Sequence, residues 1–102
     1  MRKRVWKVGI PVTDEQTVYM PEGAIPLAVG DQNNEPSSVQ MWILANPDAK
    51  LVGRRILIRG TGHPADEVEA EQYVGTVITL GGQLVWHVFD GGETERSGDG
   101  RA

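Results

Sequence analysis

Residues 73–89 read YVGTVITLGGQLVWHVF, and this stretch decides the fold class. Two runs rich in β-branched and aromatic residues, 73–80 and 84–89, flank the pair Gly81-Gly82. Such runs are typical of strands, and a glycine pair between two strands is typical of a tight turn. The stretch therefore predicts a β-hairpin.

The rest of the chain up to residue 90 has the same character. Alternation of apolar and polar residues predicts further strands at 4–10, 16–20, 24–30, 39–45 and 54–60. The third of these places Ile25, Leu27 and Val29 on one face, and Pro26, which has no N–H to donate, indicates an edge strand or a bulge. Residues 65–72 predict either a short helical turn or an open loop. The expected fold is mostly β, a single antiparallel sandwich or barrel-like sheet of about seven strands with at most one short helix.

The length of 102 residues fits one domain. Residues 91–102 hold only glycine, charged and small residues, so we expect one β-rich domain at 1–90 followed by a disordered polar tail at 91–102. No apolar run approaches the roughly 20 residues of a membrane span, and no apolar signal segment follows the basic residues 2–4. With no cysteine in the chain, we expect a cytoplasmic protein with no membrane partner.

The net charge of −4 argues against nucleic acid as a partner. The basic residues are nevertheless clustered, since eight of ten lie in two short stretches, each of which includes a predicted strand: Arg2, Lys3, Arg4 and Lys7, then Lys50, Arg54, Arg55 and Arg59. If these strands lie side by side, they form a positive face on an acidic protein. The alternative is that they carry solvated edge charges, which discourage strand-to-strand aggregation.

Two histidines and no cysteines offer no recognisable metal-ligand spacing, so we expect no metal site and no cofactor. The candidate nucleophiles for catalysis are Ser37, Ser38, Thr61 and Thr76, with His63 or His87 as base. No nucleophile-elbow pattern surrounds either serine. We therefore expect no catalytic residues and a protein that is not an enzyme.

Two features point to ligand binding instead. The glycines of the corner at 60–63 allow backbone N–H groups to converge on an anion, with arginines just upstream, although such a corner can also be purely structural. Strand alternation places Trp42 on the face opposite Met41, where it can stack on a planar ligand, anchor a partner chain or be covered by a second subunit. The candidate ligand-binding residues are Gln40, Trp42, Arg55, Arg59, Thr61 and His63.

Five blocks recur in order along the chain: TDEQT at 13–17, MPEGA at 20–24, GTGH at 60–63, YVGT at 73–76 and LVWHVF at 84–89. Together they resemble a family of proteins of about 90 residues and unassigned function, found in phages, prophages and bacteria. The resemblance covers residues 5–90. It implies a small β-rich fold and a phage or mobile-element origin, and it brings no catalytic residues with it.

Three functional hypotheses follow. The first is a non-catalytic phage-type binding protein, acting as a homo-oligomer, that sequesters a small anionic, nucleotide-like ligand. The second is an inhibitor or adaptor that binds a host protein through an edge strand or its tryptophan-bearing face. The third is a nucleotide hydrolase.

Overall fold

The computed structural model describes residues 2–32 and 37–97. Its strands are β1 (Arg4–Pro11), β2 (Glu15–Pro21), β3 (Ile25–Gly30), β4 (Ser38–Ala45), β5 (Leu51–Gly60), β6 (Tyr73–Thr79) and β7 (Leu84–Ser97). Two short 3₁₀ turns, η1 (Ala70–Gln72) and η2 (Leu80–Gly82), accompany them. None of the helical segments described is long and apolar enough to cross a membrane.

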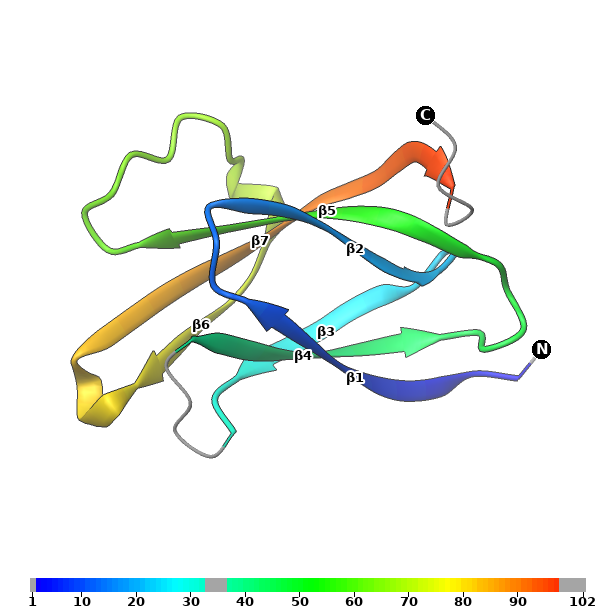
Figure 1. The fold of residues 1–102 in the computed structure, drawn as a ribbon, viewed down its shortest axis with the longest axis horizontal. Coiled ribbons are helices and arrows are strands. Elements are labelled where there is room, and N and C mark those ends of the chain that lie inside the picture. The colour runs from blue at the N-terminus through cyan, green and yellow to red at the C-terminus, as the bar shows by residue number, and fades with distance from the viewer. Residues whose placement is uncertain (1, 33–36, 98–102) are drawn as a thin grey trace.

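The strands form two antiparallel sheets (Figure 1), and this confirms the expected mostly β class. The first sheet has the order β1-β4-β3 and the second the order β2-β5-β7-β6. The 73–89 hairpin is present, and Gly81 and Gly82 take positive φ angles of 65° and 97° in its turn. Of residues 65–72, only η1 is helical, and the side chain of Gln72 accepts a hydrogen bond from the backbone N–H of Glu69.

The core lies between the two sheets because each strand turns alternate side chains inward. In β4 every second residue is buried, as Met41 and Ile43 illustrate, while Trp42 between them points to the other face. In the second sheet Ile56 and Val88 have no exposed surface.

The sheets approach each other most closely where β3 passes β6. A Cβ atom on Gly75 would lie 2.8 Å from Cγ2 of Val29, so only glycine allows this approach. Because β3 and β6 meet along one side, the sandwich is partly closed, as in a barrel.

Two features of β3 bear on the sequence prediction. It is an edge strand with a bulge between Pro26 and Ala28, as the proline indicated. The bulge, however, breaks the expected alternation. Ile25 and Leu27 are exposed whereas Val29 packs against the core, so the prediction that all three share one face was wrong.

The C-terminal strand also differs from expectation. β7 continues to Ser97, pairing Glu93 with Arg54 and Ser97 with Val52 of β5. Residues 91–97 therefore belong to the sheet and not to a polar tail, while 98–102 lie outside the described residues. The composition of this segment, rich in glycine and polar residues, led to the wrong prediction. The segment stays paired with the central strand β5 through two register shifts, and Gly92 takes a φ of 91°.

The two basic segments do not lie side by side. β1 belongs to the first sheet and β5 to the second, so the joint positive face, one of the two alternatives for these residues, does not form. The arginines of β5 instead meet carboxylates that come from other strands and loops.

Arg54 points inward from β5 and ties three segments together. Its side chain is only 9% exposed, and its Nη1 donates to Oδ2 of Asp90 at 3.1 Å. Its Nη2 donates to the carbonyl oxygen of Ala24, which precedes β3, and lies 3.8 Å from Oε2 of Glu93. Glu93 in turn accepts a hydrogen bond from the N–H of Gly23 at 2.6 Å. One guanidinium thus joins β5, β7 and the turn into β3.

We predict that Asp90→Asn lowers the free energy of unfolding by about 3 kcal/mol, because it leaves a buried guanidinium facing a neutral amide. Urea denaturation followed by tryptophan fluorescence measures the change. Glu15→Gln removes an exposed partner of an arginine and serves as the control, with a much smaller loss expected. Equal losses in the two variants would show that the interior pair has no special role.

Candidate functional site

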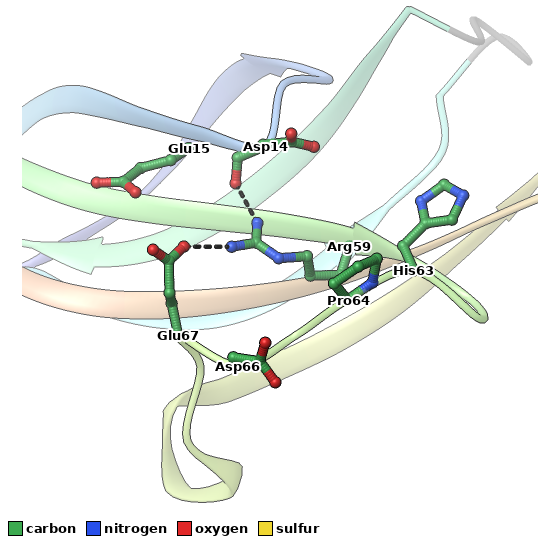
Figure 2. Close-up of a pocket in the computed structure, with 7 residues that line it drawn as sticks. All are labelled: Asp14, Glu15, Arg59, His63, Pro64, Asp66 and Glu67. Atoms are coloured by element: carbon green, nitrogen blue, oxygen red, sulfur yellow. Dashed lines mark hydrogen bonds and ion pairs between the residues drawn. The ribbon is translucent and has the colours of Figure 1, made fainter.

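A cavity of about 430 Å³ opens between the β1–β2 turn and the segment after β5 (Figure 2). We call it the acidic cavity. Its lining residues are Asp14, Glu15, Arg59, His63, Pro64, Asp66 and Glu67. Asp14 lies in the β1–β2 turn, Glu15 begins β2 and Arg59 lies near the end of β5, so the cavity depends on the position of β2 beside β5.

Arg59 lies at the centre of the acidic cavity and is already bound by protein groups. Its Nη1 donates to the carbonyl oxygens of Asp14 and Ile58, and its Nη2 donates to Oε1 of Glu67 at 3.2 Å. The Arg59 side chain is 10% exposed, whereas that of Glu67 is 67% exposed. The guanidinium is therefore fixed, while its carboxylate partner belongs to a solvated side chain whose ion pair is worth little.

Glu15 is held by Arg55 in a two-point contact. Arg55 donates from Nε to Oε2 at 2.5 Å and from Nη2 to Oε1 at 3.1 Å. These hydrogen bonds lower the pKa of Glu15 below its ordinary value of 4.5, and the charge of Arg55 acts in the same direction. Arg55 is thereby occupied and does not face the cavity as a free cation.

The other two carboxylates, those of Asp14 and Asp66, form no ion pair within the described residues. In Figure 2 both point away from the Arg59 guanidinium, whereas the carboxylate of Glu67 points toward it. Four carboxylates against one guanidinium give the lining a formal charge of −3 with His63 neutral. Carboxylates therefore outnumber guanidinium groups around the cavity, even when Arg55 beside Glu15 is counted.

The corner at 60–63 is a tight turn. The N–H of His63 donates to the carbonyl oxygen of Gly60 at 3.0 Å, and Gly62 has a φ of 88°. The imidazole folds back over Gly60, so that a Cβ on Gly60 would lie 2.8 Å from ring atoms Cε1 and Nδ1. His63 lines both the acidic cavity and a second cavity of about 210 Å³ that reaches Trp86.

Beside this corner, His87 joins two hydroxyl groups. Its Nε2 lies 2.7 Å from Oγ1 of Thr61 and its Nδ1 lies 3.0 Å from Oγ1 of Thr76, which also contacts the hydroxyl of Tyr73. Thr61 and His87 thus meet at the distance of a nucleophile and its base. Thr76 lies where a catalytic triad has a carboxylate. Its hydroxyl is neutral, and it stabilises an imidazolium less than a carboxylate does.

The candidate ligand-binding residues do not form one site within one chain. Arg59 and His63 line the acidic cavity, and Arg55 lies beside it, bound to Glu15. Thr61 lines the second cavity. Gln40 and Trp42 lie on the outward face of β4, in the other sheet.

The residues missed at the cavity are its carboxylates. Asp14 and Glu15 follow Thr13 in a turn, and Asp66 and Glu67 begin an acidic run, but nothing in the sequence brings the two segments together. Across residues 2–32 and 37–97, no group of three or more histidine or acidic side chains is arranged to hold a metal ion.

The family model described as a domain of unknown function, DUF7352, matches residues 1–98. The chain belongs to this family. That agrees with the resemblance to a small family of unassigned function, and the match includes the β7 extension that composition had assigned to a tail. No curated protein and no solved structure matches the chain.

We predict that wild-type protein loses stability relative to Glu15→Gln as the pH falls below 4.5. The folded-state pKa of Glu15 is depressed, so its contribution is fully present above the unfolded-state pKa and is lost as the pH falls through the folded-state value. Free energies of unfolding between about pH 3 and 7 measure the difference between the two proteins. If the difference does not change with pH, the Arg55 contact does not persist in solution.

We also predict that Gly60→Ala moves the His63 ring without unfolding the domain, since the new Cβ meets an exposed side chain. The imidazole ¹H–¹⁵N resonances of His63 report the displacement. Gly9→Ala is the matched control, because its Cβ meets only the Gln40 side chain at 3.7 Å or beyond. Unchanged His63 resonances in Gly60→Ala would contradict the folded-back ring.

Proposed function

We propose that this domain is a non-catalytic binding protein that takes a basic segment of a partner protein into the acidic cavity. The observation that carries the proposal is the state of Arg59, whose guanidinium is bound by protein groups, while Asp14 and Asp66 line the same cavity and form no ion pair within the described residues. A lysine or arginine side chain of a partner supplies a cation for these carboxylates.

The sheet edges support recognition at a cavity rather than by strand addition. The outer strand β3 carries Pro26 and a bulge, and β6 has a bulge between Tyr73 and Gly75. Prolines also end β1 and β2, at Pro11 and Pro21. Bulges and prolines make an edge a poor template for another strand.

The chemistry beside the cavity supports a binding role over hydrolysis. His87 is within reach of Thr61, but its other nitrogen meets the hydroxyl of Thr76. Among the described contacts of His87, no carboxylate is present to stabilise the positive charge that the imidazole would gain if Thr61 attacked a substrate. The proposal retains the phage-type origin and the cytoplasmic location expected from the sequence.

A second candidate is the small anionic, nucleotide-like ligand. One observation favours it: Arg59 is held in place by two carbonyl oxygens, and the Glu67 carboxylate on it is exposed enough to be displaced by a phosphate. The remaining carboxylates of the cavity oppose an incoming anion, and for this reason we rank the basic segment first.

Glu67→Gln separates the two candidates because it changes their affinities in opposite directions. We predict that a tetra-arginine peptide with blocked ends shifts the amide resonances of residues 13–15 and 63–67, and that Glu67→Gln weakens this binding about tenfold. ADP, used as the anionic probe, gains affinity in Glu67→Gln if the second candidate is right, since Arg59 then loses its competitor.

The matched control is Glu71→Gln, which removes the same charge from η1 outside the acidic cavity. It is expected to leave the affinity for the peptide within about twofold of the wild-type value, because Glu71 does not line the acidic cavity and exposed charges contribute little. Absence of peptide-induced shifts at millimolar peptide overturns the proposal. Tighter binding of ADP to Glu67→Gln than to the wild type replaces it with the second candidate.

A further inference from the structure

The outward face of the first sheet leaves apolar side chains uncovered in the part of the chain that the structure describes. The register places three cross-strand rows on it. They are Val5–Leu44–Ile25, Lys7–Trp42–Ala28 and Gly9–Gln40–Gly30. Val5 and Ile25 are 59% and 51% exposed, whereas the strand residues that face the core are almost fully buried. We call these rows the outer face.

The outer face is flat enough to pack against another sheet. The Trp42 ring lies over Gly30, where a Cβ would approach ring atom Cζ3 at 3.2 Å, so the indole lies along the sheet instead of standing off it. Lys7 bends across to donate a hydrogen bond to Oε1 of Gln32 at the far end. The Val5–Leu44–Ile25 row is left as an aliphatic ridge at the near end, where face-to-face sheets interdigitate.

The flanks of the aliphatic ridge carry opposite charges. A shallow cavity of about 270 Å³ next to Ile25 and Leu44 is lined on one side by Lys3, which precedes β1, and on the other by Glu22, which precedes β3. Neither residue forms an ion pair within the described part of the chain. Since β1 and β3 flank β4 on opposite sides, the positive and negative groups lie on opposite sides of the central strand.

This arrangement is self-complementary. A two-fold axis parallel to β4 and lying in the contact plane exchanges the two sides of the sheet, so it sets Lys3 of one copy against Glu22 of the other on both flanks. A partner of uniform charge would instead be repelled by one flank. We infer that the outer face is the interface of a symmetric homodimer of this chain, with the aliphatic ridges in contact and two Lys3–Glu22 pairs at the rim.

The size of the outer face sets the strength of this association. Three strands about 4.8 Å apart and three rows about 7 Å apart span roughly 300 Å² of sheet on each copy. This is below the roughly 800 Å² per partner of a standard stable interface, so the dimer is expected to be reversible and concentration-dependent. The outer face shares no residue with the acidic cavity, so this inference stands apart from the proposed function.

Sedimentation velocity of the full chain from about 10 μM to 1 mM tests the inference, with a rising weight-average mass expected over this range. Ile25→Lys places a charge on the ridge and is expected to weaken association at least about tenfold. Ile78→Lys is the matched control, because it makes the same change at a 61% exposed position on β6 of the other sheet. Its association is expected to equal that of the wild type.

Charge reversal tests the two-fold arrangement. Lys3→Glu and Glu22→Lys each place like charges on both flanks and are expected to weaken the dimer, whereas the double variant restores opposite charges and recovers wild-type association. A monomer at every concentration overturns the inference. So does a dimer that Ile25→Lys and Ile78→Lys weaken equally, and so does a double variant that fails to recover.

Discussion

The buried guanidinium of Arg54 is the interaction on which the arrangement of the two sheets depends. A charge between packed sheets is tolerated only when it is paired and hydrogen-bonded, and Arg54 meets Asp90, the carbonyl oxygen of Ala24 and, at longer range, Glu93. These partners come from β7 and from the turn that enters the first sheet. The contact therefore fixes how the two sheets face each other at this end of the sandwich, and it requires β7 to continue past Asp90.

The three arginines of β5 show how alternation decides the role of a side chain. Arg54 points into the core, whereas Arg55 and Arg59 point outward, and each meets carboxylates from a different segment. A cluster of basic residues in the sequence thus becomes three arginines that are ion-paired at separate places. The acidic cavity therefore contains one of these three arginines, Arg59, among four carboxylates.

The acidic cavity and the outer face belong to different sheets. The cavity is built from the β1–β2 turn, the end of β5 and the segment that follows it, while the outer face is built from β1, β4 and β3. A dimer formed through the first sheet leaves both cavities accessible to partner segments. Two cavities on one dimer would bind two basic segments of the same partner more tightly than one, because the second contact becomes intramolecular.

The sequence by itself determined the strands, the fold class and the orientation of side chains in regular strands such as β4, because a period of two follows from local backbone geometry. It also indicated the irregularity at Pro26, since a missing N–H is a property of one residue. It did not determine the length of β7, because Glu93 and Ser97 are held by pairing with β5 and not by their own propensity.

The sequence did not determine the candidate site either. Asp14, Arg59 and Glu67 lie 45 and 8 residues apart along the chain, and only the pairing of β2 with β5 and the return of the following segment bring their charges together. Tertiary structure alone decided which arginines were neutralised, since ion pairs form between neighbours in space.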